Sequence, residues 1–335
     1  AQTAETKIEI KELEQNSIDL LDIAGQESAK RGLEVAAAGG HNIAFWGPPG
    51  TGKTMLAKAL TGILPPLTLS ETLEVTGVQS AVGALTSDYA TEPPFRSPHH
   101  TSSYVAMVGG GAVPRPGEIT LAHRGVLFMD EFPEFDRRVI EAMRQPLEDR
   151  IISVSRAFGQ ARFPASFILV AALNPCPCGN RGSSKRPCDC SGGTLARYAK
   201  RISGPVIDRI DLWIFVGEVD HSKLSLGGAE SSKIVRARIA TARKIQTDRF
   251  QNETVSNNAE MGVKELKKYG KLTPDLEKML ATSATRLNLS ARGYHRTIKI
   301  ARTIADLAGS KEIGEQHLLE AITFRSERLK EVMRF

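Results

Sequence analysis

Residues Gly47–Thr54 read GPPGTGKT, and this stretch decides how the rest of the chain is interpreted. A short apolar stretch, Ile43–Trp46, precedes it, and residues 53–63 continue with helical spacing as far as Pro65-Pro66. The eight residues fit the pattern G-x-x-x-x-G-K-[ST] between a strand and a helix, which predicts a loop whose backbone N–H groups surround an anion. The positive end of the helix that begins near Lys53 would strengthen the attraction for phosphate. A chance glycine turn is the alternative, but it does not account for the flanking strand and helix.

The side chains of this loop predict a nucleotide site with a metal ion. We expect Lys53 to reach the β- and γ-phosphates and Thr54 to hold Mg²⁺. The predicted cofactors are therefore ATP and Mg²⁺. The residues expected to contact the nucleotide are Gly47, Pro48, Pro49, Gly50, Thr51, Gly52, Lys53 and Thr54.

A second apolar stretch, Gly125–Met129, ends in Asp130 and Glu131. Asp130 is expected to complete the Mg²⁺ shell and Glu131 to orient the attacking water. Taken alone, the two carboxylates could merely cap the next helix, which is expected over residues 136–148. Beside a phosphate-binding loop, the catalytic interpretation is favoured.

Asn174 follows the apolar stretch Ile168–Leu173. Its amide could lie between the catalytic carboxylate and the γ-phosphate and sense the loss of that phosphate. The alternative is a simple Asn-Pro turn with Pro175. We favour the sensor because the strand order would place Asn174 beside Asp130.

Arg209 comes directly before another buried stretch, Leu212–Val216. There it could reach the γ-phosphate of a neighbouring subunit as an arginine finger. A local ion pair with Asp208 or Asp211, which would contribute little, accounts for the same pattern equally well.

All four cysteines lie in residues 175–193, as Cys176, Cys178, Cys188 and Cys190. Two close pairs can supply four thiolates to tetrahedral Zn²⁺, although one residue within each pair is shorter than the usual spacing. Reduced structural thiols are the alternative. The basic residues between positions 181 and 201 form a patch that could face phosphate or be solvated. They are Arg181, Lys185, Arg186, Arg197, Lys200 and Arg201, against Asp189 alone.

Residues 151–163 read as a β-hairpin around Phe158-Gly159, with Arg156, Gln160 and Arg162 near its tip. Arginine beside an aromatic ring suits phosphate contact and base stacking, so DNA contacts are predicted for Arg156, Phe158 and Gln160. Solvated arginines are the alternative.

The chain has 335 residues and a formal net charge of +6, with a pI of about 9.1. The basic balance suits a polyanionic partner, although charge alone is weak evidence. No apolar run reaches the roughly 20 residues that cross a bilayer, and the polar start lacks a signal sequence. We expect a cytoplasmic protein without membrane contact. A linker over residues 1–22, a parallel α/β core over residues 23–219 and a helical domain over residues 220–335 are predicted.

These segments together resemble the magnesium-chelatase-like AAA+ ATPases of the ComM (YifB) type, which are linked to DNA uptake and branch migration. Besides the motifs above, the resemblance is carried by Phe95–His100, Val108–Gly111, Pro114–Ile119, Asn174–Gly179 and Ala301–Leu307. It implies an α/β P-loop AAA+ core with a C-terminal helical lid domain.

The resemblance also implies roles for particular residues. Arg209 matches the arginine finger of the family, and Arg292 resembles its second sensor, with Arg296 as the substitute. Residues 95–117, with Arg115, resemble an insertion in helix 2 that points with the hairpin into the pore of a ring. A hexamer is expected from the class and not from particular residues. His99-His100 fits such a pore loop better than a metal site.

Members of the resembled family usually carry a further N-terminal domain. This chain begins at the expected linker, so functions of that domain are not assigned to it. The leading hypothesis is a homo-oligomeric, hexameric DNA translocase or helicase that promotes branch migration in natural transformation or recombination. A chelatase-type motor that helps insert Mg²⁺ into a tetrapyrrole is the second hypothesis. A nucleotide-gated scaffold without turnover is the third, and the complete set of catalytic side chains argues against it.

Overall fold

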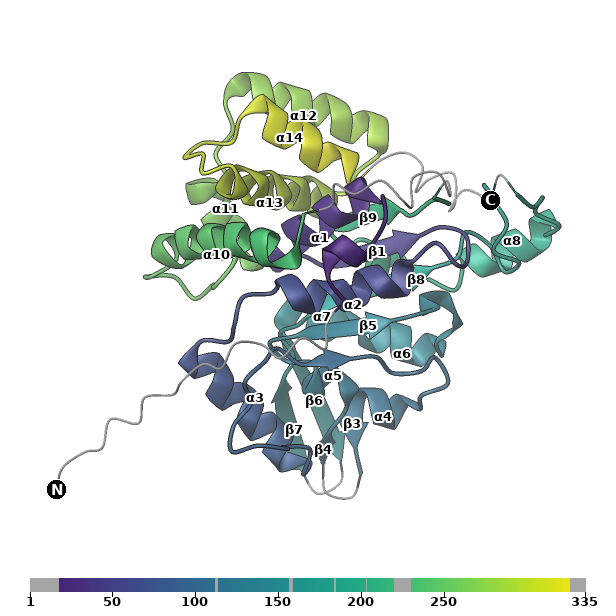
Figure 1. Cartoon of the computed structure of the whole chain (residues 1–335), viewed down its shortest axis with the longest axis vertical. Coiled ribbons are helices and arrows are strands. Elements are labelled where there is room, and N and C mark those ends of the chain that lie inside the picture. Colours follow the sequence, from purple (N-terminus) through teal and green to yellow (C-terminus); the bar gives the residue numbers. More distant parts are fainter. Residues whose placement is uncertain are drawn as a thin grey trace.

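A five-stranded sheet forms the centre of the computed structural model, which describes residues 18–111, 114–156, 159–183, 185–202, 204–219 and 230–325. Its strands are β1 (Ile43–Trp46), β2 (Phe95–Arg96), β5 (Val126–Met129), β8 (Ile168–Leu173) and β9 (Leu212–Phe215). Their order is β2-β5-β8-β1-β9, and every neighbouring pair is parallel. The predicted parallel α/β core is therefore confirmed (Figure 1).

The apolar runs of the sequence form strands that are covered on both faces. All residues of β5 and β8 are buried. Along β5, Val126 and Phe128 enter one hydrophobic core while Leu127 and Met129 enter the other. This alternation follows from the two-residue period of a strand and accounts for the continuously apolar runs.

Helices on the two faces of the sheet build these two cores. The first core contains α1 (Glu27–Gly39), α2 (Lys53–Ile63) and helices of the C-terminal region. The second core contains α4 (Tyr104–Val108), α5 (Glu118–Leu121), α6 (Arg137–Ala142), α7 (Arg144–Asp149) and α9 (Gly204–Ile207). Short 3-10 helices lie at η1 (Leu20–Asp22), η2 (Phe132–Glu134) and η4 (Asn258–Glu260).

The helix expected over residues 136–148 is divided into α6 and α7 at Met143. Pro146 has no N–H to donate to the carbonyl of Ala142, so the helical hydrogen-bond ladder is interrupted there. The division directs α7 towards the strand β6 (Ile151–Arg156), with which it is in contact.

The segment between β1 and β5 contains more regular structure than its composition indicates. Residues from 76 onwards are rich in Gly, Pro, Ser and His, yet the helix α3 (Leu69–Ala81) extends into this segment. Farther along, β3 (Gly109–Gly110) pairs antiparallel with β4 (Arg115–Pro116). Hydrogen bonds from Arg96 to both carboxylate oxygens of Glu118, each 2.7 Å long, hold the two ends of this insertion together.

The insertion lies beside a second antiparallel pair, β6 with β7 (Gly159–Pro164). Strand β3 contacts β6, and both small sheets gather with α3 at the end of the molecule opposite the C-terminal helices (Figure 1). Two elements that are far apart in the sequence therefore present one common edge.

The C-terminal region contains helices and no strand among its described residues, 230–325. It contains α10 (Ser232–Arg249), α11 (Val263–Tyr269), α12 (Pro274–Leu287), α13 (Ala291–Leu307) and α14 (Glu315–Thr323). Helix α13 packs on α14, α10 and α1, and the backbone N–H of Trp213 donates to the Phe324 carbonyl over 2.9 Å. None of the helices in the described part of the chain is long and apolar enough to cross a membrane.

Candidate nucleotide-binding site

The loop between β1 and α2 has the geometry of an anion cradle. A Cβ on Gly47 would lie 2.1 Å from the carbonyl oxygen of Val216, so only glycine fits beside the end of β9. Gly52 caps α2 with φ +92°, a left-handed conformation that favours glycine. The buried side chains of Leu56, Ala57 and Leu60 anchor the helix so that its N-terminus faces the loop.

Lys53 is folded back inside this loop. Its ammonium donates to the carbonyls of Gly47 and Pro48, each over 2.8 Å, and to Oδ1 of Asn174 over 3.3 Å. Burial lowers the pKa of Lys53 to about 8, against an opposing effect of the nearby Asp130 carboxylate. A phosphate group would supply the negative charge that this buried cation lacks.

The side chains of Thr54 and Asp130 are hydrogen-bonded to each other at the edge formed by the carboxyl ends of the strands. The Thr54 hydroxyl donates to Oδ2 of Asp130 over 3.0 Å, and Oδ1 of Asp130 accepts the Glu131 N–H over 2.9 Å. A hydroxyl and a carboxylate oxygen are ligands that Mg²⁺ prefers. These two side chains are thus suitably paired to hold that ion beside the phosphates.

Glu131 has an unforeseen partner in His100. Nδ1 of His100 lies 3.1 Å from Oε2 of Glu131, and the His100 ring lies edge-on to Phe135. The backbone of Glu131 has φ +50°, a left-handed conformation that is uncommon for residues other than glycine. Sequence reasoning assigned His99-His100 to a pore loop, and it missed this contact because no local pattern signals it.

Asn174 lies at the end of β8, between β5 and β1 in the sheet. Its side chain accepts from Lys53, and its carbonyl accepts from the Tyr198 hydroxyl over 3.0 Å. Burial raises the pKa of Tyr198. The structure therefore brings together Lys53, Thr54, Asp130, Glu131 and Asn174 at the carboxyl ends of three parallel strands.

Arg209 and Arg292 lie elsewhere, on the two oxygens of one carboxylate. Arg209 is 5% exposed and is paired with Oε2 of Glu148, while Nη2 of Arg292 lies 2.9 Å from Oε1 of the same residue. The alternative prediction, a local ion pair between Arg209 and Asp208 or Asp211, was wrong. Asp211 is instead paired with Arg296. Burial acts to raise the pKa of Asp211, but the nearby Arg296 charge lowers it below its usual range.

Both arginines are held by Glu148 and not by the loop before α2. Arg292 and Arg296 line a cavity of about 900 Å³ together with Glu148. A different cleft, of about 570 Å³, lies beside the loop and includes Pro48 to Gly52 in its lining.

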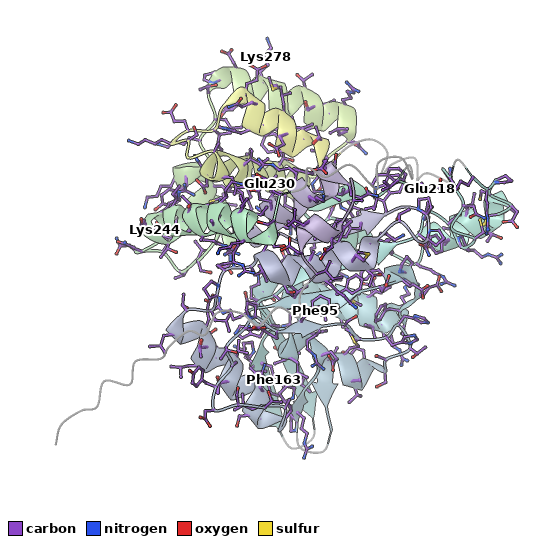
Figure 2. The ribbon with its side chains drawn as sticks, viewed as in Figure 1. Phe95, Phe163, Glu218, Glu230, Lys244 and Lys278 are labelled. Atoms are coloured by element: carbon purple, nitrogen blue, oxygen red, sulfur yellow. The ribbon has the colours of Figure 1, made fainter. Side chains whose placement is uncertain are left out.

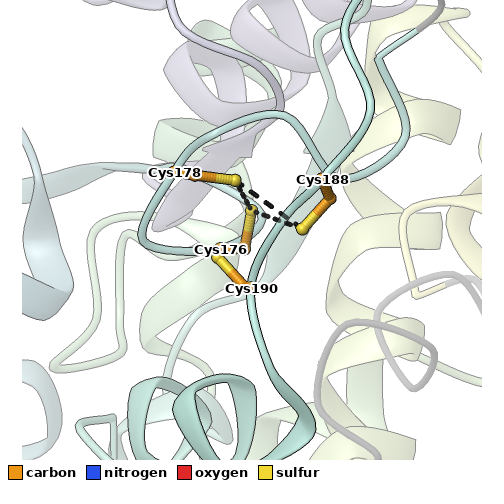
Figure 3. Close-up of side chains that lie close together, drawn as sticks. All are labelled: Cys176, Cys178, Cys188 and Cys190. Carbon is orange, nitrogen blue, oxygen red and sulfur yellow. Dashed lines mark hydrogen bonds between the residues drawn. The ribbon is translucent and has the colours of Figure 1, made fainter.

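The four cysteines come together as predicted for a metal site (Figure 3). Their sulfur atoms all lie within 4.8 Å of one another, and Sγ of Cys176 is 3.3 Å from that of Cys178 and 3.7 Å from that of Cys188. Four thiolates at about 2.3 Å from one tetrahedral Zn²⁺ would be separated by about 3.8 Å. The cluster, completed by Cys190, therefore fits such an ion.

The candidate DNA contacts are only partly described. The side chains of Arg156 and Gln160, and Phe158 as a whole, lie outside the described residues. Arg115 on β4 and Arg162 on β7 are exposed at the end of the molecule that β3 and β6 share. Of the basic residues near the cysteines, Arg201 is paired with Glu134.

The sheet order, the loop before α2 and the polar residues that end β5 and β8 define a P-loop protein of the AAA+ class. The sequence matches the family described as magnesium chelatase, subunit ChlI, over residues 19–224, and the ChlI C-terminal family over residues 229–325. The chain belongs to the magnesium-chelatase family. Membership implies ATP and Mg²⁺ as ligands, and the donors of Lys53, Thr54 and Asp130 suit both.

Several curated proteins are similar to this chain over nearly all of its length. "Competence protein ComM" of Haemophilus influenzae is 46% identical over 315 residues, which are 93% of this chain and 60% of that protein. "Uncharacterized protein YifB" of Escherichia coli is 46% identical over 312 residues, or 92% of this chain and 60% of that protein. The chain thus spans about 60% of these relatives. "DNA replication licensing factor mcm-6" of Caenorhabditis briggsae is 24% identical over 93% of this chain and 38% of that protein.

Proposed function

We propose that this chain is the motor core of an ATP-driven DNA translocase or helicase. It works as a homo-oligomeric, hexameric ring and promotes branch migration during natural transformation or recombination. The observation that carries the proposal is the convergence of Lys53, Asp130, Glu131 and Asn174 at one sheet edge. Arg209 and Arg292 are held together by Glu148 at a separate place, where a neighbouring subunit could use them.

Within one subunit, the loop binds and orients the nucleotide. Lys53 exchanges its two carbonyl partners for phosphate oxygens, and Thr54 and Asp130 hold Mg²⁺. That ion, when bound, neutralises charge on the β- and γ-phosphates. Glu131 orients the attacking water after its carboxylate leaves His100, and Asn174 reports the state of the γ-phosphate through Lys53.

Between subunits, Arg209 and Arg292 complete the site of a neighbour. Both guanidinium groups are held by Glu148, so they form one cationic unit rather than two scattered charges. A ring with head-to-tail contacts presents such a surface to the adjacent nucleotide. The γ-phosphate would then replace Glu148 as the partner of Arg209 and stabilise transition-state charge.

DNA binding is proposed for the common edge of the β3–β4 ribbon and the β6–β7 hairpin. Arg115 and Arg162 are exposed there, and the net charge of the chain is +6. The names of two relatives, a competence protein and a DNA replication licensing factor, support DNA as the substrate.

We also propose Zn²⁺ as a structural ion of the four-cysteine cluster. The distances between the sulfur atoms support it, since they fall near those of a tetrahedral thiolate site.

The test is the ATPase rate with and without forked or single-stranded DNA, at low and at moderate salt. A DNA motor predicts strong stimulation that weakens as salt rises, because phosphate contacts release counterions. Hydrolysis that DNA neither stimulates nor inhibits at low salt would contradict the proposal.

A chelatase-type motor remains the second candidate, because both matched families are described as parts of a magnesium chelatase subunit. It predicts a measurable ATPase rate that DNA leaves unchanged. It also predicts that the protein recovers a tetrapyrrole-binding subunit from a lysate of its source cells.

A further inference from the structure

The four-cysteine insertion packs directly on the nucleotide-binding loop. Cys176 follows Asn174 by two residues, so the insertion begins at the sheet edge that carries the site. Gly179 has φ +79°, and a Cβ there would lie only 2.7 Å from Cδ of Pro49. The chain around the cysteines and the loop before α2 are therefore in close contact, with no room for a larger residue between them.

The same insertion forms one wall of the cleft beside the loop. Asn180, Ser183, Lys185 and Arg186 line this cleft of about 570 Å³, and Gly50 to Gly52 line it from the other side. Lys53, Thr54 and Asp130 do not belong to its lining. Since those three residues serve the phosphates and Mg²⁺, the cleft is suited to the nucleoside end of the nucleotide.

The shape of this wall is fixed from both ends. The Ser183 hydroxyl donates to Oε1 of Glu218 over 2.8 Å and accepts the Lys185 N–H over 3.1 Å. Cys178 and Cys188 lie on either side of this segment, with their sulfur atoms 3.6 Å apart. Figure 2 shows Glu218 on the side of the molecule from which the insertion projects. A metal ion on the cysteines would therefore hold Lys185 and Arg186 at the cleft.

The charges that face the cleft are of both signs. Lys185 and Arg186 are exposed cations on the insertion, while Asp22 and Glu218 are acids on the opposite segments. The nucleoside end of a nucleotide offers a partner for each kind of group: the face of the base suits the cations, and the ribose hydroxyls can donate to carboxylates.

We propose that the four-cysteine insertion is a metal-held wall of the nucleotide site, in which Lys185 and Arg186 contact the nucleoside end of a bound nucleoside triphosphate. Loss of the metal then weakens nucleotide binding although no cysteine touches the nucleotide. The inference rests on the proposed ATP site but not on DNA translocation. The cluster would thus link the metal or thiol state of the protein to its occupancy by ATP.

The first experiment compares two double variants of the full chain. Lys185→Ala with Arg186→Ala removes the two cations of the wall. Arg197→Ala with Lys200→Ala removes two exposed cations of α8 (Gly192–Ala199) and the residue after it, which do not line the cleft. Zinc content is measured together with the Kd of a fluorescent ATP analogue. We expect both variants to retain zinc, and only the first to bind the analogue about tenfold more weakly, as for the loss of one charge-assisted contact.

The second experiment removes the metal and leaves Lys185 and Arg186 in place. Chelation under reducing conditions should weaken the Kd to a similar extent, and added Zn²⁺ should restore it. Cys188→Ser should lower the zinc content and the affinity together. Substitution with Co²⁺ should give the visible absorption of a tetrathiolate site in the wild type and lose it in Cys188→Ser. A folded, metal-free protein with an unchanged Kd would overturn the proposal, as would a reduced wild type that takes up neither metal.

Competition with inorganic triphosphate locates the contact. If Lys185 and Arg186 act on the nucleoside end, this competitor should bind the wild type and the first double variant equally well. An equal loss for triphosphate and for ATP would overturn that assignment. Lys53→Ala tests the ATP site itself, and the proposed function fails if this variant binds ATP normally. If only the Lys185→Ala, Arg186→Ala double variant keeps a normal Kd, this inference alone fails.

Discussion

Nδ1 of His100 lies 3.1 Å from Oε2 of Glu131, so the insertion before β5 touches the carboxylate that is proposed to orient the attacking water. His100 belongs to the same insertion as the exposed Arg115, one of the proposed DNA contacts. The contact therefore supplies a physical path from the proposed DNA-binding edge to the proposed catalytic carboxylate. The imidazole occupies Oε2 of Glu131 and therefore competes with water for that oxygen.

His100→Ala should raise the ATPase rate without DNA several-fold and reduce the additional stimulation by DNA. The reason is that Glu131 loses the partner that competes with water, while the ATP-binding loop is untouched. Steady-state ATPase assays with and without single-stranded DNA measure both effects. His99→Phe is the matched control, because it keeps an aromatic ring against His100, and His99 itself bonds to Thr101 and not to Glu131. An equal fall of both rates in His100→Ala would show that His100 supports Glu131 rather than restrains it.

Arg209→Ala should bind ATP but not hydrolyse it, since the defect lies across the subunit interface. Lys53→Ala should fail to bind ATP. A mixture of these two inactive variants should recover activity at roughly a quarter of the sites in a ring with head-to-tail contacts. There an intact loop of one subunit meets an intact Arg209 of the next. Mixing followed by an ATPase assay measures the recovery.

The mixing experiment needs a check on folding, because Arg209 is buried and paired with Glu148. Glu148 is half exposed and retains Arg292, but the buried Arg209 also donates to the Pro205 carbonyl, so the loss of stability should be about 1 to 3 kcal/mol. Thermal unfolding of Arg209→Ala measures it. Full activity of Arg209→Ala in the assembled ring would refute the finger assignment.

The core of the fold was predictable because its signals are local. The runs Ile43–Trp46, Val126–Met129 and Ile168–Leu173 are apolar throughout, as strands covered on both faces must be. The glycines and Lys53 of the loop form a pattern that seldom occurs between a strand and a helix without binding phosphate. These signals place the nucleotide site without knowledge of any distant contact.

Two elements of the insertion before β5 were not predicted, one although a local signal was present and one because none exists. The helix α3 begins with Thr68 and Glu71, whose side chains each accept the backbone N–H of the other residue, a capping box that the sequence T-L-S-E displays. Strand β2 has only two residues and gives no periodicity at all.

The ion pairs around the site could not be found from the sequence for a different reason. Glu148 lies 61 residues from Arg209 and 144 from Arg292, so their meeting depends on how the helices pack. Likewise, nothing in the residues near His100 indicates that its ring faces Glu131. The sequence offers several possible partners for each of these side chains, and only the tertiary packing determines which of them meet.

Arg115→Ala should weaken DNA binding and make it less sensitive to salt. If Arg115 contacts one phosphate of single-stranded DNA, the slope of log K against log salt should fall by about 0.7. Fluorescence anisotropy with a labelled oligonucleotide at several salt concentrations measures the slope. Lys278→Ala is the control, because it removes a charge at the other end of the molecule (Figure 2). Equal slopes in wild type and Arg115→Ala would show that Arg115 does not contact a DNA phosphate.

ATP binding should weaken as the pH rises above about 8, because burial lowers the pKa of Lys53 to about 8 in the free protein. A bound triphosphate favours the charged ammonium and raises that pKa, so binding above pH 8 must take up a proton. The Kd should therefore be insensitive to this group below about pH 7 and rise by up to about tenfold per pH unit above 8. Titration with a fluorescent ATP analogue from pH 6.5 to 9.5 measures this dependence.

Calorimetry in buffers of different ionisation enthalpy gives the proton uptake directly, and at pH 8.5 it should be roughly three quarters of a proton per ATP. Lys53→Arg provides the control, because a guanidinium stays charged over the whole range. Whatever its absolute affinity, its Kd should lose the dependence on pH above 8. A wild-type Kd that is constant up to pH 9.5, with no proton uptake, would mean that the Lys53 ammonium is already fully charged in the free loop.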